Sequence, residues 1–396
     1  NNTPHGCVYA PVSVSFLEAR EREFQIFAKP VGALCNLRCG YCYYIGKQSI
    51  HGDARPLLMS DDILEKYIVQ HIEATTDDVI FFSWHGGEPL MAGIDFFRKA
   101  VSLQEKYKPA GKEIINGIQT NATLIDWDWA YFLAQEKFLV GISIDGPGDL
   151  HNQYRKAADG NSSLQQVLKG YDILQRSGIK PEILCVVSSF NVKFPLVVYD
   201  FFRELGAENI TFLPLVEKRP RSASGVSRAT VPATEFGSFL MAVFDEWLEK
   251  DIGKIKIQII EEAARTAFGQ KHTLCIFREN CGGVPVVELN GDFYSCDHYV
   301  DKEYLVGNIT DGSIAEFLDS DRQKEFGMLK SLTLPRYCLE CDVRSMCNGE
   351  CPRNRFIKTP DGEPGLNYLC EGYKAFFHHC KPFVDAIGGI WNEQVR

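Results

Sequence analysis

The stretch Cys35-Asn36-Leu37-Arg38-Cys39-Gly40-Tyr41-Cys42 brings three cysteines within eight residues. It follows residues 24–28, a short apolar segment of the kind that forms a buried strand. Three thiolates this close together can ligate three irons of a cubane cluster, which leaves the fourth iron open to another ligand. Zinc is the alternative, but structural zinc takes four ligands, and no obvious fourth lies nearby in the sequence.

Short apolar segments alternate with helical patterns from this motif to about residue 216. We expect strands at residues 24–28, 79–84, 114–120, 140–144, 182–187 and 210–215. Helices are expected between them, at 60–73, 95–107, 126–137, 163–177 and 195–205. Six strands separated by helices predict an α/β fold with a parallel, partial (β/α)6 barrel. The site of such a barrel lies at the C-terminal ends of its strands.

The remainder of the chain has a different character. A helix is expected at 234–250, and the sequence after residue 275 becomes loop-rich and rich in cysteine, with a hairpin at 286–294 that turns on Asn290-Gly291. We therefore expect an N-terminal extension at 1–23, a barrel at 24–252 and a loop-rich, cysteine-ligated C-terminal domain at 253–396.

Composition excludes several classes of protein. The 396 residues are 45% hydrophobic and 24% charged, as in ordinary globular chains. The net charge of −10 argues against nucleic acid as a partner, and no apolar run is long enough to span a membrane. Residues 1–20 show no signal peptide, so we expect a cytoplasmic protein in which the clustered cysteines among the 14 serve metal binding rather than disulfides.

The first motif, with an aromatic residue before its last cysteine, resembles that of the radical S-adenosylmethionine (SAM) enzymes. A second feature of that family, Gly86-Gly87-Glu88-Pro89, follows the second expected strand. The resemblance implies a [4Fe-4S] cluster on Cys35, Cys39 and Cys42 whose open iron binds the amino and carboxylate groups of SAM. Reductive cleavage of SAM then yields a 5′-deoxyadenosyl radical that abstracts a hydrogen atom.

The same resemblance implies a set of SAM contacts. They are Tyr41, Gly86, Gly87, Glu88, Ser143 and Asp145. Arg155 either pairs with the SAM carboxylate or is a solvated surface arginine. Val216 is assigned a SAM contact only because it follows the sixth strand.

The later cysteines resemble the SPASM pattern, beginning with Cys281-x9-Gly291-x4-Cys296. Family analogy implies two further [4Fe-4S] clusters, one on Cys275, Cys281, Cys296 and Cys351, the other on Cys338, Cys341, Cys347 and Cys370. A pair of zinc sites is the alternative, because CxxC spacing is also typical of zinc ribbons. Of the remaining cysteines, Cys185 is expected in the core, and Cys7 and Cys380 have no predicted role.

Five stretches narrow the likeness to anaerobic sulfatase-maturating enzymes, although His85 stands where some members have glutamine. They are residues 119–125, 138–147, 183–187, 296–300 and 305–309. The resemblance implies oxidation of a cysteine or serine in a sulfatase motif to Cα-formylglycine. A hydrogen atom leaves Cβ, a second electron follows, and a base removes the thiol or hydroxyl proton.

Asp297 matches the family's proposed base; a capping role at the end of the hairpin is the alternative. Tyr44 is a candidate wall of the active site. The expected partners are an unfolded or nascent sulfatase polypeptide and an electron donor such as flavodoxin or ferredoxin. The two auxiliary clusters either accept the second electron or pass electrons to the SAM cluster.

Two other functions stay open. One is a SPASM enzyme that forms thioether or carbon–carbon crosslinks in a precursor peptide, although many of those carry a longer N-terminal module than the residues before strand one provide. The other is a non-catalytic iron–sulfur carrier or zinc-binding protein, which has no use for the Gly86-Gly87-Glu88 motif.

Overall fold

A computed structural model describes residues 22–47, 58–219 and 225–394. The expected N-terminal extension, 1–23, therefore lies almost entirely outside the described residues, as does Cys7.

One sheet organises the described part of the chain, with the strand order β10-β9-β8-β1-β2-β3-β4-β5-β6-β7. Its parallel barrel strands are β1 (Phe27–Lys29), β2 (Val79–Trp84), β3 (Glu113–Thr120), β4 (Leu139–Ser143), β5 (Glu182–Val187), β6 (Asn209–Pro214) and β7 (Lys256–Ile257). β8 (Val286–Glu288) joins β1 in parallel, and β9 (Asp292–Tyr294) and β10 (Leu305–Asn308) continue antiparallel. A small separate sheet pairs β11 (Ile357–Lys358) with β12 (Pro364–Leu366).

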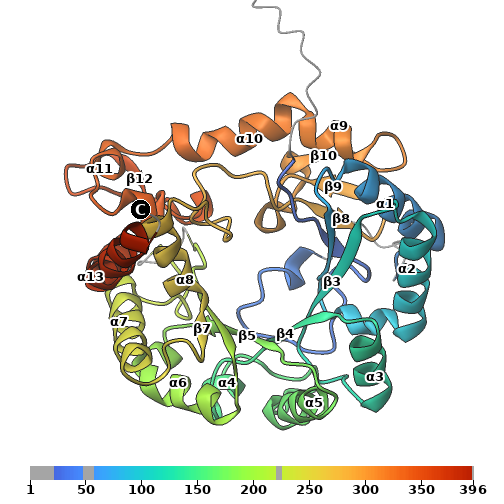
Figure 1. Cartoon of the computed structure of the whole chain (residues 1–396), viewed down its shortest axis with the longest axis horizontal. Coiled ribbons are helices and arrows are strands. Elements are labelled where there is room, and N and C mark those ends of the chain that lie inside the picture. The colour runs from blue at the N-terminus through green and yellow to red at the C-terminus, as the bar shows by residue number, and fades with distance from the viewer. Residues whose placement is uncertain (1–21, 48–57, 220–224, 395–396) are drawn as a thin grey trace, which may run out of the picture.

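Helices cover the outside of the barrel, as Figure 1 shows. They are α1 (Asp61–Ala74), α2 (Ile94–Tyr107), α3 (Trp127–Gln135), α4 (Asp149–Asn152), α5 (Leu164–Arg176), α6 (Pro195–Glu204), α7 (Ala233–Lys250) and α8 (Gln258–Arg265). The expected N-cap is confirmed at α1, where the Ser60 hydroxyl accepts from the Ile63 amide at 3.3 Å.

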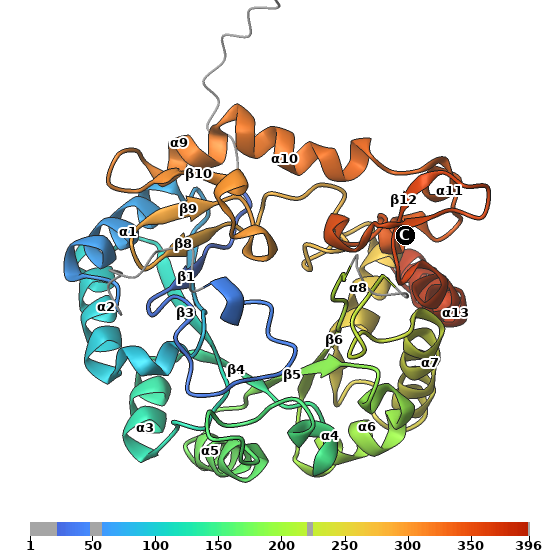
Figure 2. The same ribbon diagram turned by 180° about the vertical axis from the view of Figure 1, so that it is seen from behind.

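The C-terminal part closes the ring of elements. Its helices are α9 (Ile314–Asp319), α10 (Asp321–Leu332), α11 (Arg336–Leu339), α12 (Arg344–Cys347) and α13 (Cys370–Gln394). Single 3-10 turns also occur in the chain, at η2 (Pro89–Ala92), η3 (Asn191–Lys193), η4 (Thr266–Phe268), η5 (Asp297–Tyr299), η6 (Lys302–Tyr304) and η7 (Pro352–Asn354). Figure 2, seen from behind, shows α9 and α10 crossing from the β8–β10 edge toward α13.

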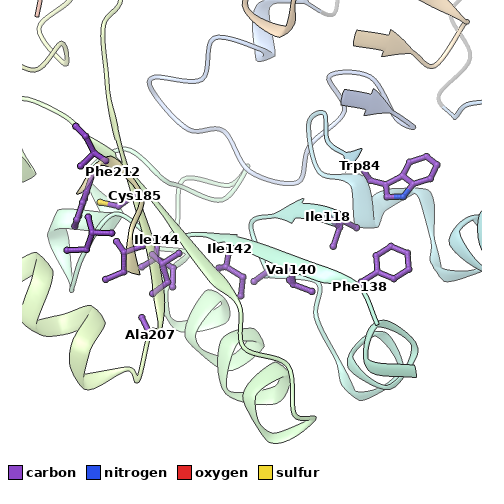
Figure 3. Packing of buried hydrophobic residues seen from close by; sticks show 14 of the residues in the cluster. Trp84, Ile118, Phe138, Val140, Ile142, Ile144, Cys185, Ala207 and Phe212 are labelled. Carbon is purple, nitrogen blue, oxygen red and sulfur yellow. The ribbon is translucent and has the colours of Figure 1, made fainter. Parts of the chain in front are cut away.

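The core lies between the barrel strands and the helices. Figure 3 shows apolar side chains of neighbouring strands packed in a row, among them Trp84, Ile118 and Ile142, all buried. Cys185 lies in this layer with no exposed surface, so its predicted place in the core is confirmed. Burial on both faces explains why these strands read as continuous apolar runs.

The hairpin expected on Asn290-Gly291 is present as β8 and β9, with Gly291 at a φ of +86°. Its attachment to β1 was not predicted. The sheet consequently runs across the expected boundary near residue 253, and the division into domains at that point stays a prediction.

Helix α13 was also not predicted, because Pro382 lies inside it and proline usually ends a helix. It packs closely on α7 through two glycines. A Cβ on Gly372 would lie 2.0 Å from the Ala233 carbonyl oxygen, and one on Gly237 would lie 2.6 Å from the Gly372 carbonyl oxygen. The two backbones therefore approach too closely for any larger residue.

Gly372→Ala should destabilise the protein by about 1–3 kcal/mol, because the added methyl group forces the helices apart. Anaerobic thermal unfolding of the cluster-loaded protein measures this as a lower midpoint. Gly389→Ala is the matched control on the same helix, since nothing lies within 4 Å of its Cβ position. Equal midpoints for the two variants would contradict the close-packing account.

Candidate active site and cluster ligands

The loop after β1 carries the first three cysteines, and their thiols interact with one another electrostatically. Burial raises the pKa of Cys35 to about 12 and that of Cys39 to about 11. Such thiols stay protonated at neutral pH unless a metal displaces the proton. Their convergence from one loop fits a cluster held by three thiolates.

The loop after β2 braces the cysteine loop. The amide of Gly87 donates to the Gly32 carbonyl and that of Glu88 to the Leu34 carbonyl, both at 2.8 Å. A Cβ on Gly87 would lie 2.0 Å from the Leu34 oxygen, and Gly86 has a φ of +131°. Only glycine permits this approach and this conformation.

The Glu88 side chain is fully buried and is already satisfied by protein donors. Its carboxylate accepts from the Thr120 hydroxyl at 2.7 Å and from the amides of Asn121 at 2.8 Å and Leu90 at 3.1 Å. Burial raises the pKa of Glu88 to about 7, against the opposing effect of these donors. Glu88 therefore orders the loops at the barrel mouth, and its contact with SAM stays a prediction.

Tyr41, Asp145 and Arg155 form one buried network. The Tyr41 hydroxyl and the Arg155 Nε donate to the same oxygen of Asp145, at 2.5 and 2.9 Å. The solvated-surface interpretation of Arg155 is wrong, because only 7% of its surface is exposed. Its charge is held near Cys39 instead, where it counteracts the rise in the pKa of that thiol.

Ser143 and Val216, the other two expected SAM contacts, lie at or just beyond the C-terminal ends of barrel strands. Ser143 ends β4, and its hydroxyl accepts from the Gln119 side chain at 3.2 Å. Val216 is buried two residues beyond β6. Their positions are compatible with the expected site, and direct contact with SAM stays a prediction.

Asp297 lies at the start of η5 and forms an ion pair with Lys29, the last residue of β1. The Lys29 ammonium lies 2.5 Å from Asp297 Oδ1, and only 2% of the lysine side chain is exposed. Tyr43 donates its hydroxyl proton to the other oxygen of Asp297. Burial acts to raise the pKa of Asp297, but the charges of Lys29 and His298 and the contacts with Lys29 and Tyr43 together outweigh burial and hold that pKa below its ordinary value.

Several residues of this network were missed in the sequence. Besides Lys29 and Tyr43 they include Glu288, which accepts from the Tyr44 hydroxyl, and His85, whose ring stacks on Phe27 at 3.8 Å. Burial raises the pKa of Glu288 to about 8 and lowers that of His85 to about 3. The sequence offered one signal for this network: Lys29 ends an apolar strand, and a buried ammonium group requires an acidic partner nearby.

The two networks meet at Cys42. Burial raises the pKa of its thiol, whereas Arg155 on one network and Lys29 on the other lower it. Asp297 also interacts with this thiol. The candidate base and the candidate SAM cluster therefore share one site at the mouth of the barrel.

The structure gathers eight C-terminal thiols into two groups. Electrostatic interactions join Cys275, Cys281, Cys296 and Cys351 in one group. The second group is Cys338, Cys341, Cys347 and Cys370, which line one apolar cavity with Tyr337 and Val343. These are the sets that the family resemblance implied, and their ligation of metal stays a prediction.

The spread of these thiols bears on the zinc alternative. In the described ranges, no three or more His, Cys, Asp or Glu side chains converge tightly enough to hold a single metal ion. Zinc would require such convergence, with about 2.3 Å from metal to sulfur.

Comparison with known proteins identifies the class. The radical SAM superfamily model matches residues 30–196, and the SPASM iron–sulfur cluster-binding domain matches residues 279–342. The chain is thus a radical SAM protein with iron–sulfur clusters and SAM as its cofactors.

Full-length relatives narrow this class. A serine-type anaerobic sulfatase-maturating enzyme of Bacteroides thetaiotaomicron is 42% identical over 91% of this chain and 90% of its own. A cysteine-type enzyme of Clostridium perfringens is 32% identical, over 90% of this chain and 96% of its own. The solved structure of anSMEcpe with bound AdoMet and the Cp18Cys peptide superposes with a TM-score of 0.83 at 30% identity, covering 92% of this chain and 99% of that one.

The chain belongs to the anaerobic sulfatase-maturating enzymes. Its family and structural neighbours indicate a peptide substrate. None of the described helices combines the length and apolar character that crossing a membrane requires.

Gly87→Ala should weaken SAM binding at least about tenfold, because the methyl group displaces the loop that carries Cys35. Equilibrium dialysis of the iron-loaded protein with SAM measures this change. Gly46→Ala is the control in the same region, since no described residue lies within 4 Å of its Cβ position. Unchanged SAM binding in Gly87→Ala would exclude a role for this close approach.

Proposed function

We propose that the protein oxidises a serine or cysteine in a sulfatase active-site motif to Cα-formylglycine. The observation that carries this proposal is the ion pair between buried Lys29 and largely buried Asp297, both of which interact electrostatically with the thiol of Cys42. It provides an ionised carboxylate next to the loop that holds the radical-generating cofactors. Together with family membership, this arrangement favours a reaction that needs both a hydrogen-abstracting group and a base.

The cofactors are held as follows. Cys35, Cys39 and Cys42 ligate the SAM cluster, and the two C-terminal groups of four thiols ligate one auxiliary [4Fe-4S] cluster each. The SAM pocket is formed by residues at the ends of the barrel strands and in the loops that follow them, and Glu88 holds these loops together. The pocket residues are Tyr41, Gly86, Gly87, Ser143, Asp145, Arg155 and Val216. The SAM cluster, when present with SAM and reduced, would supply a 5′-deoxyadenosyl radical for hydrogen abstraction from the substrate Cβ.

Asp297 acts on the substrate proton. After the Cβ hydrogen has left, formation of the carbon–oxygen double bond requires the hydroxyl proton and one electron to leave as well, and an auxiliary cluster held by the C-terminal thiols would accept that electron. Asp297 takes the proton, because a carboxylate kept ionised by Lys29 is ready to accept one. With cysteine, the same steps give a thioaldehyde, which water converts to the aldehyde with release of hydrogen sulfide.

Lys29 and Tyr43 orient the base. Lys29 forms an ion pair with one oxygen of Asp297 and Tyr43 donates a hydrogen bond to the other, so the carboxylate has little freedom to rotate. Tyr44 helps to position Lys29, because the lysine ammonium lies 4.5 Å from the centre of the Tyr44 ring. The Tyr44 hydroxyl in turn donates a hydrogen bond to Glu288. The capping role considered for Asp297 explains none of these contacts.

The substrate is an unfolded or nascent sulfatase segment, and flavodoxin or ferredoxin supplies electrons in the cytoplasm. Serine is the first residue to test, because the relative at 42% identity is serine-type, although relatives near 32% are of both types. A crosslinking SPASM enzyme, the second candidate, would release 5′-deoxyadenosine with this peptide but no aldehyde.

Anaerobically reconstituted protein should bind about twelve irons per chain, the content of three four-iron clusters. Cys370→Ala should lower this to about eight, because one cluster loses a ligand. Cys185→Ala should keep about twelve, since Cys185 is a buried core residue that belongs to none of the three thiol groups. Iron and zinc analysis measures both, and stoichiometric zinc with little iron would rule out the cluster assignment.

With SAM, a reductant and a peptide bearing the sulfatase motif, the enzyme should produce an aldehyde detectable by mass spectrometry. Asp297→Asn should lower aldehyde formation about 100-fold or more while 5′-deoxyadenosine still forms, because only proton removal is impaired. Asp301→Asn is the control, as this exposed neighbour pairs with Lys47 at 2.8 Å. Full aldehyde yield from Asp297→Asn would remove Asp297 from this role.

A further inference from the structure

Lys330 on α10 is a buried cation that the proposed chemistry does not use. None of its surface is exposed. Its ammonium group donates to the main-chain oxygens of Cys275 at 3.0 Å and Ile276 at 2.7 Å. Both partners are neutral, and among the described residues no carboxylate pairs with Lys330 at salt-bridge distance. A buried charge with only neutral partners is unfavourable unless a negative group lies nearby.

Arg355, next to Lys330, is a second cation whose hydrogen bonds go to main-chain carbonyl oxygens. Its guanidinium donates to four main-chain oxygens, including those of Lys330 at 2.5 Å and Gly349 at 2.8 Å. Three of these oxygens belong to residues 348–350, which all have positive φ. Arg355 thus holds an unusual turn in place and fixes the C-terminal end of α10, where Lys330 is anchored.

Glu350 is a buried carboxylate that interacts electrostatically with both cations, but among the described residues it forms no ion pair with either of them. It accepts from the side-chain amides of Asn354 and Asn367. Lys330 also interacts with the side chains of Cys275 and Cys281, which would be negatively charged thiolates as ligands of a cluster.

We infer that Lys330 compensates the charge of the iron–sulfur cluster on Cys275, Cys281, Cys296 and Cys351 and raises the reduction potential of that cluster. The inference rests on the ligand set proposed above. Four thiolates give a [4Fe-4S] cluster a net negative charge, and each added electron increases it. A fixed positive charge in a poorly polarisable interior stabilises the reduced form more than the oxidised form.

Lys330 is therefore a positioning residue for electron transfer. Oxidation of the substrate releases a second electron after hydrogen abstraction, and a higher potential makes the nearby cluster a better acceptor. Lys330 does not touch the substrate, so its effect must appear in the potential of the cluster itself.

An anaerobic redox titration followed by electron paramagnetic resonance tests this inference. In Lys330→Met, the equilibrium constant for reduction of one auxiliary cluster should fall about tenfold, which is 59 mV for a one-electron couple. Lys330→Arg keeps the charge and should stay near the wild-type potential. Lys324→Met, an exposed lysine on the same helix, is the matched control. The SAM-cluster signal, recognised by its response to SAM, should not shift in any variant.

An unchanged potential in iron-replete Lys330→Met overturns the inference. If this variant loses iron, Lys330→Gln decides, because it keeps a donor for the carbonyl groups without the charge. A lowered potential in Lys330→Gln supports the inference, whereas an unchanged potential, or loss of iron there too, shows a purely structural lysine and overturns it. Iron content and aldehyde formation of the wild-type enzyme, measured in parallel, report separately on the ligand set and the proposed function.

Discussion

The parallel pairing of β8 with β1 is the contact on which the candidate active site depends. It covers an edge of the barrel sheet that would otherwise expose unpaired backbone groups. Because β8 leads through the turn at Gly291 to β9 and η5, the same pairing carries Asp297 to Lys29 at the end of β1. One strand pairing thus joins the two halves of the chain and completes the site.

Charge compensation is the rule that orders the interior of this site. Lys29 is matched by Asp297, Arg155 by Asp145, and the carboxylate of Glu88 by three donors. Each pair gains strength from burial, and each member would be costly alone. The C-terminal part departs from this rule, since Lys330 and Arg355 donate their hydrogen bonds to main-chain carbonyl groups and not to carboxylates.

Local patterns predicted most of the barrel. The bounds of β2 and β5 agree with expectation to the residue, and α1, α2 and α5 agree within one residue at each end. Apolar runs and capping residues are short-range signals, so a single sequence suffices to read them. The short strands β7 and β10 carry too little pattern to be recognised, and Pro382 hid helix α13.

The sequence by itself determined the kinds of chemistry: three clustered thiols, two glycines and a carboxylate after the second strand, and a further set of closely spaced cysteines. Only the tertiary structure decided which of these groups meet. It places Cys351 beside Cys281 and Cys296 rather than with its neighbour Cys347, buries Arg155 against Asp145, and gives Asp297 its lysine. Spacing along a chain records proximity only within a loop or turn, whereas these contacts join segments that the folded sheet alone brings together.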